Sequence, residues 1–235
     1  MWPRTKNPDW HVDPQRSATS SATRFATFIT GRWKWAVAAA AGLLALSAAI
    51  AGYFAWSGKT ETDAATLLRK AVSQFEASSR SGSDAEKQEE GIRLLHEVIN
   101  RYPKNAAAAE ATLRLGTHYY TAGKYNEVRT VYTTYLDKNP RGQIAFSAGL
   151  GLGDTYLAER NYEKAVETYS RLIEQFAQEP LLPEAQLHLA RAYLGLNRLK
   201  DAGALYEKIV ATYPNTGWAQ SAQAELYKLG LTSRQ

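Results

Sequence analysis

The sequence predicts an all-helical protein in which one membrane-spanning helix precedes a stack of helical hairpins. Two observations carry this prediction. Residues 35–56 form an apolar stretch without a charge, and after it a pattern of apolar, small and aromatic residues recurs every 37 residues. A third observation limits the function, because the chain contains no cysteine and therefore no thiol nucleophile, disulfide or thiolate metal site.

The basic character of the chain is concentrated at its N-terminus. The 235 residues carry a formal net charge of +5. Residues 1–34 hold six basic side chains against two acidic ones, a net of +4, so the remainder is almost neutral. A nucleic-acid-binding surface would need basic residues spread over a folded face. We therefore expect no nucleic-acid partner, and we expect the Pro-, Ser- and charge-rich tail over 1–34 to be disordered.

The uncharged stretch of residues 35–56 has the length and edges of a membrane span. At about 1.5 Å per residue its 22 residues would reach roughly 33 Å, enough to cross a hydrocarbon core of about 30 Å. Trp33 and Trp35 stand at one edge, and Tyr53 and Trp56 stand at the other, as in the aromatic belts of membrane helices. A cleaved signal peptide is the alternative, but the long leader and the long apolar run favour an uncleaved anchor.

The charge distribution predicts the orientation of this helix. Basic residues flanking a span are retained in the cytoplasm, which places the tail there and residues 57–235 across the membrane. In a bacterium, residues 57–235 would then be a periplasmic domain, and the protein would belong to the inner membrane. A lipid-anchored form is excluded, because that modification requires a cysteine.

The 37-residue repeat is visible at many positions, and we call each set of equivalent positions in successive units a column. A Leu-Gly-x-x-Tyr motif begins at Leu115 and again at Leu152, and it returns at Leu189 with alanine in place of glycine. Prolines close the units, and other columns keep the same spacing. These columns are Tyr125, Tyr162 and Leu199; Val128, Ala165 and Ala202; Tyr132, Tyr169 and Tyr206; Tyr135, Leu172 and Ile209; and the prolines Pro103, Pro140, Pro180 and Pro214.

The columns resemble the tetratricopeptide repeat over about residues 62–235. Two features depart from that pattern, since its tryptophan column is lost and the period is 37 rather than 34. The resemblance implies a solenoid of three to four helical hairpins, each of which buries its apolar stripe against its neighbours. Gly116, Gly153 and Ala190 are then the small residues at which the two helices of a hairpin cross closely.

The two ends of the array look irregular. The first unit, with Gly91 in register, carries the insertion "ASSRSGSDAEKQEE", and we expect a loop about seven residues longer than in the other units. The last stretch, "GWAQSAQAELYKLG", repeats only the start of a unit, with Leu226 in the leucine column. We expect it to form a single capping helix.

No constellation of residues predicts catalysis. The histidines share no metal-ligand spacing, and each is expected to be a satisfied or solvated side chain; they are His11, His96, His118 and His188. The segment "GLGLGDTY" lacks the glycine spacing, the preceding strand and the lysine of phosphate-binding loops. We expect a protein that is not an enzyme and that has no cofactor and no metal.

Binding of a protein partner is the remaining class of function, and the resemblance implies which residues would contact that partner. In this repeat class four positions of the first helix of each unit face a concave groove. Carried over, they are Glu110, Leu113, Thr117 and Tyr120; Ser147, Leu150, Asp154 and Leu157; and Glu184, Leu187, Arg191 and Leu194. They predict a row of leucines that holds an apolar segment of a protein partner. The alternative is that the protein's own helices, such as residues 62–79, already cover the row.

The combination of one anchor and a periplasmic array resembles the ancillary subunit family of the bacterial Sec translocon, and also related envelope-assembly and division proteins. The resemblance implies a scaffold that assists protein export or envelope assembly, with translocon, chaperone or assembly components as partners. It is compatible with a homo-oligomer. A scaffold of a cell-wall, division or polysaccharide-secretion complex is the alternative.

Overall fold

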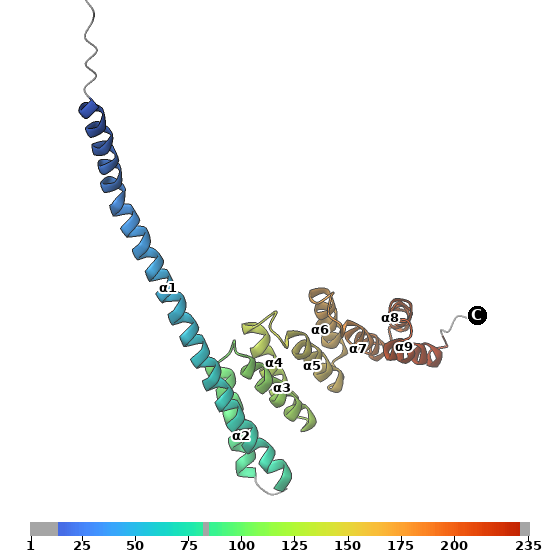
Figure 1. The fold of residues 1–235 in the computed structure, drawn as a ribbon. Coiled ribbons are helices and arrows are strands. Elements are labelled where there is room, and N and C mark those ends of the chain that lie inside the picture. Colours follow the sequence, from blue (N-terminus) through green and yellow to red (C-terminus); the bar gives the residue numbers. More distant parts are fainter. Residues whose placement is uncertain (1–13, 82–84, 231–235) are drawn as a thin grey trace, which may run out of the picture. The chain divides into compact units, whose positions relative to one another are not determined.

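The computed structural model describes residues 14–81 and 85–230, and every regular element in that part of the chain is an α-helix (Figure 1). The chain divides into two compact units, residues 1–58 and residues 59–235. The helices are α1 Pro14–Ser81, α2 Ala85–Arg101, α3 Ala106–Thr121, α4 Tyr125–Lys138, α5 Ala145–Ala158, α6 Tyr162–Gln175, α7 Leu182–Gly195, α8 Leu199–Thr212 and α9 Gly217–Lys228.

In the first unit, the described residues all belong to α1. The helix begins at Pro14, and a proline is favourable there because the first N–H groups of a helix have no partner within it. No proline or glycine follows until Gly31, so nothing in the sequence stops the helix before the apolar stretch. Of the tail predicted over 1–34, residues 14–34 belong to α1, and residues 1–13 lie outside the described range.

The apolar stretch of α1 is long and apolar enough to cross a membrane. Its large side chains are exposed, with Leu43 67%, Leu44 71% and Trp56 66% accessible. A helix surface formed by apolar side chains on all sides is favourable in lipid and unfavourable in water.

The second unit is a succession of helical hairpins in sequence order, each built from two neighbouring helices. Residues 64–75 of α1 pack against α2 to form the first hairpin. The following hairpins are α3 with α4, α5 with α6 and α7 with α8. Helix α9 is the single helix expected to cap the array. This arrangement confirms the predicted solenoid of tetratricopeptide type.

The tight turns within three hairpins share one backbone conformation. Gly123, Arg160 and Asn197 lie 37 residues apart, and all three have a positive φ, at 67°, 58° and 59°. The left-handed conformation reverses the chain after the first helix of each hairpin, as it does at many helix C-termini. The repeat is thus preserved in the backbone even where the residue type has changed.

The insertion in the first unit does not form the long loop that was expected. Helix α1 continues to Ser81 and α2 begins at Ala85, so most of the added residues lengthen the two helices instead. A Cβ atom on Gly91 would lie 2.7 Å from the backbone nitrogen of Phe75, so glycine is needed where these two helices touch. The part of the segment that begins α2, "AEKQEE", consists of good helix formers, which favours extension of that helix.

Gly116 and Gly153 lie at the predicted close crossing of the two helices of a hairpin, and a tyrosine ring packs against each of them. A Cβ on Gly116 would lie 2.5 Å from Cε1 of Tyr132, and a Cβ on Gly153 would lie 2.6 Å from Cζ of Tyr169. The tyrosine ring of the second helix therefore rests directly on the glycine of the first. Burial of this ring offsets the lower helix propensity of glycine, which costs about 1 kcal/mol.

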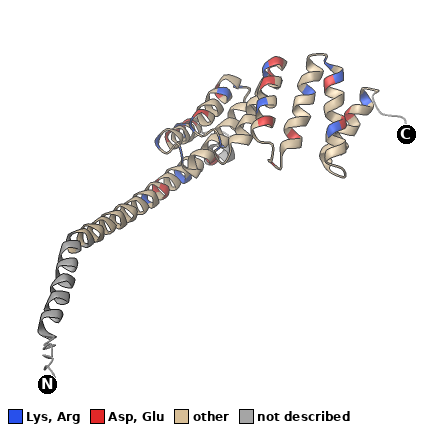
Figure 2. Cartoon of the chain, turned by 90° about the horizontal axis from the view of Figure 1, so that it is seen from above, with Lys and Arg blue, Asp and Glu red and all other residues tan. Residues whose placement is uncertain are grey.

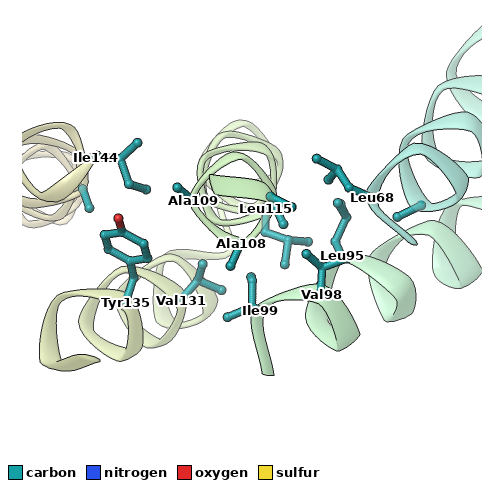
Figure 3. Close-up of a cluster of buried hydrophobic side chains, with 14 of the residues drawn as sticks. Leu68, Leu95, Val98, Ile99, Ala108, Ala109, Leu115, Val131, Tyr135 and Ile144 are labelled. Atoms are coloured by element: carbon teal, nitrogen blue, oxygen red, sulfur yellow. The ribbon is translucent and has the colours of Figure 1, made fainter. Parts of the chain in front are cut away.

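Buried side chains form several clusters along the array instead of one core. The largest joins α1 through α4 and reaches the start of α5 (Figure 3). In Figure 3, Leu115 of α3 lies between Leu68 of α1 and Val131 of α4, with Val98 and Ile99 of α2 beside it. Successive hairpins are thus held together by the apolar stripes that none of them could bury alone.

Candidate partner-binding site

The first helices of the hairpins line one side of the repeat domain. Helix α3 contacts α5, α5 contacts α7 and α7 contacts α9, whereas no such contact joins α4 to α6 or α6 to α8 in the described part of the chain. The first helices are therefore crowded on the inside of the array, and the second helices are spread around its outside. We call the inner surface of α3, α5 and α7 the groove face; all twelve predicted residues belong to these three helices.

The predicted residues of α3 lie beside the end of α1 that belongs to the repeat domain. Glu110 and Leu113 line a cavity of about 510 Å³ together with residues 61–69 of α1. Arg114 forms ion pairs with Glu110 at 2.8 Å and with Glu76 of α1 at 3.4 Å. Leu113 is half-buried against the largest cluster. At this point the chain's own first helix partly covers the leucine row.

In α5, the two predicted leucines pack toward the next hairpin. Leu150 is half-buried and contacts the clusters that contain Leu182 and Leu189 of α7. Leu157 is half-buried in the second of these clusters, while Ser147 remains exposed.

In α7, the expectation of an exposed leucine is wrong at Leu187. Its side chain is only 5% accessible and lies in a cluster with Tyr206 of α8 and Leu226 of α9. Leu194 is half-buried against the same cluster, and Arg191 is exposed. The leucine row is therefore not an open apolar strip, because each leucine packs against the neighbouring helix.

The exposed part of the groove face is mostly polar. Five predicted residues are exposed on it, and Glu184 is half-buried at the start of α7. The exposed residues are Glu110, Thr117, Tyr120, Ser147 and Arg191. Charges of both signs are distributed over the repeat helices (Figure 2).

Asp154 is the centre of a polar network on this face. The hydroxyl of Tyr169 donates a hydrogen bond to Asp154 Oδ1 at 2.6 Å, and His188 Nδ1 lies 2.5 Å from the same oxygen. Burial, reinforced by the Asp154 carboxylate, raises the pKa of Tyr169 far above its ordinary value, so the hydroxyl stays protonated and donates. The network joins α5, α6 and α7, and only Asp154 was among the predicted site residues.

The repeat register explains this network and could have revealed it. Each tyrosine of the column at 132, 169 and 206 points between two successive first helices. There it lies near residues of two further columns. One column is formed by Thr117, Asp154 and Arg191, and the other by Gly151, His188 and Glu225. The two columns differ from unit to unit, so each tyrosine has different neighbours. Tyr206 is the contrasting case, because its buried hydroxyl has no partner among the described residues.

Beside Asp154, the groove face contains a small hollow. It has a volume of about 210 Å³ and lies between α3 and α5. Its lining consists of Thr117, Tyr120, Tyr132, Gly151 and Asp154. Three of these five residues are in the predicted set, which brings Thr117, Tyr120 and Asp154 together in one place.

The sequence matches two tetratricopeptide-repeat models, one over residues 65–105 and the other over residues 150–215. The chain contains tetratricopeptide repeats. Arrays of such repeats present extended surfaces that bind other proteins, so the chain is a protein-interaction scaffold. A comparison with curated proteins finds no match.

Two solved structures agree with this fold. A Podosopora anserina protein with nearly identical TPR-like repeats, named after the kinesin light chain, is 20% identical with a TM-score of 0.52, over 69% of this chain and 86% of that chain. A single-residue variant of the same protein gives a TM-score of 0.53, over 69% and 85% of the two chains, at 20% identity. The Arabidopsis OM64 TPR domain is 19% identical with a TM-score of 0.44, over 52% of this chain and 95% of that chain. The likeness at this identity concerns the fold alone.

Proposed function

We propose that the protein is a scaffold of the bacterial cell envelope, anchored in the inner membrane by residues 35–56, whose periplasmic repeats hold a protein partner on the groove face. The observation that carries the proposal is the order of elements, an exposed apolar helix followed by repeats that bind proteins. The groove face supports the proposal further, because it combines exposed polar residues with hollows between the first helices. Assistance to protein export or envelope-protein assembly is the role that this combination favours.

Crosslinking in intact membranes tests the groove face. A photo-reactive residue at Ser147, which is exposed on α5, is expected to capture a specific protein. The matched control is the same residue at Thr130, which is exposed on the outer helix α4. The crosslinked products are identified by mass spectrometry. A product obtained equally from both positions, or only from Thr130, would place the partner elsewhere.

The absence of cysteine allows a clean test of orientation. We expect Ser170→Cys, exposed on α6, to react with a membrane-impermeant maleimide added to spheroplasts, because it lies in the proposed periplasmic domain. Thr5→Cys in the tail is expected to react only after the membrane is permeabilised. Both variants should remain in the membrane fraction at full length. Labelling of Thr5→Cys alone would reverse the proposed topology, and a soluble, shortened chain would show a cleaved signal.

A further inference from the structure

The hollow beside Asp154 lies where one unit has a glycine and the next units have a side chain. Position 151 is glycine, whereas the equivalent positions in α7 and α9 are His188 and Glu225. The ring of Tyr132 approaches Gly151 so closely that a Cβ there would lie 2.7 Å from Cε2. The ring of Tyr132 thus takes the place that a side chain at 151 would occupy, and the hollow lies beside this contact. Its volume of about 210 Å³ is several times that of a water molecule, about 30 Å³.

The charge of the hollow comes from Asp154. Both hydrogen-bond partners, Tyr169 and His188, engage Oδ1, and no described residue makes a hydrogen bond to Oδ2. The side chain is 29% accessible, which leaves it partly shielded from water. Among the described residues, the one basic side chain with a nitrogen within 4.0 Å of the carboxylate is His188, at 2.5 Å, and no lysine or arginine nitrogen is that close. A carboxylate held in this way attracts a cation more strongly than one in bulk water.

The walls of the hollow favour the same kind of ligand. Tyr120 is 39% accessible and Tyr132 is buried, and both contribute aromatic rings to the lining. Burial raises the pKa of Tyr132 to about 12, so this ring carries no negative charge near neutral pH. The faces of tyrosine rings attract cations. An anionic ligand would be repelled by the Asp154 carboxylate. An apolar ligand would exclude water from that carboxylate without offering it a hydrogen bond or a positive charge.

We propose that this hollow receives a lysine or arginine side chain from an extended segment of the protein partner. The inference rests on the proposed function and specifies the chemistry of the partner at one point of the groove face. The ammonium or guanidinium group pairs with Asp154, while the aliphatic stem lies against Tyr120 and Tyr132. Exposed Arg191, which stands in the column of Asp154 one unit further along, is not among the residues that line the hollow.

Two fluorescent peptide pools of random sequence provide the probe. They are identical except for a fixed central residue, which is lysine in one pool and its apolar analogue norleucine in the other. Binding to the full chain in detergent is measured by fluorescence anisotropy. We expect the lysine pool to bind about ten times more tightly than the norleucine pool, and we expect added salt to reduce this difference. Equal affinities, or no measurable binding by either pool, overturn the inference.

Three variants locate the effect. Asp154→Asn keeps an oxygen that can accept from Tyr169 but removes the charge, so the preference for lysine should disappear while the melting temperature stays near that of the parent. Tyr120→Leu should reduce the preference severalfold. Asp201→Asn removes an exposed carboxylate of α8 that pairs with Arg198, and it should leave the preference unchanged.

The outcomes separate this inference from the proposed function. If both pools bind equally and Ser147 still captures its partner, the groove face is a binding site but the hollow does not select a cation. If Asp154→Asn retains the preference for lysine, the cation is bound elsewhere, and the inference fails. If Asp154→Asn and Asp201→Asn reduce the preference equally, only the net charge of the protein attracts the pool, and the inference fails as well.

Discussion

Gly153→Ala is expected to destabilise the repeat domain strongly, although alanine is the better helix former. The added Cβ would lie 2.6 Å from Cζ of Tyr169, far inside normal contact. The ring cannot move away easily, because its hydroxyl is bonded to Asp154 and the side chain is fully buried. Overpacking of this kind costs about 1–3 kcal/mol. Unfolding in urea, followed by circular dichroism of the full chain in detergent, measures the loss.

The matched control for this prediction is Gly217→Ala in α9. A Cβ on Gly217 would meet no atom within 4 Å, so the same substitution should leave stability unchanged or raise it by up to about 1 kcal/mol. If Gly153→Ala changes the stability no more than Gly217→Ala does, the Tyr169 ring does not pack against Gly153 as described.

Leu187→Asp is expected to have the second large effect. Leu187 is 5% accessible and packs among α7, α8 and α9, so the variant would place an unpaired carboxylate inside an apolar cluster. An uncompensated buried charge costs about 3–5 kcal/mol. The C-terminal hairpin and the cap should therefore lose their structure, which a reduced helical signal and rapid proteolysis of α8 and α9 would report.

Leu199→Asp is the control for this charge. Leu199 is 48% accessible and begins α8, where an acidic residue near the helix N-terminus is favourable. Its stability should equal that of the parent protein. A folded Leu187→Asp variant with parent-like stability would mean that Leu187 is exposed after all, and that the leucine row is open to a partner.

Much of the fold could be predicted because the repeat constrains every unit in the same way. The columns of Gly116 and Tyr132 recur at Gly153 and Tyr169, and the structure keeps their contact. The extension of α1 and α2 into the insertion could not be predicted from those columns, because nothing in the later units corresponds to it. There, the good helix formers at the start of α2 favour extension from that side only.

The candidate site was harder to predict, since exposure depends on a neighbouring helix. Leu113, Leu150 and Leu187 share one column, but Leu187 is covered by α8 and α9 while Leu113 borders a cavity beside α1. Their shared register predicts on which face of its helix each leucine lies, but it does not predict which neighbouring helix packs against that face. The bond from Tyr169 to Asp154 illustrates the same difficulty, since the register brings the two columns together but the residue that each tyrosine meets changes from unit to unit.

The contacts between helices in the repeat domain have a consequence for how the chain folds. Among the described residues, tertiary contacts join each helix from α2 to α9 only to the next helix or the one after it. The loops that must close are therefore short, and topologies of low contact order fold fast. Each hairpin can form as soon as its own residues and those of its predecessor are available. Folding can thus proceed from the N-terminal hairpin onward during synthesis, before α9 has been made.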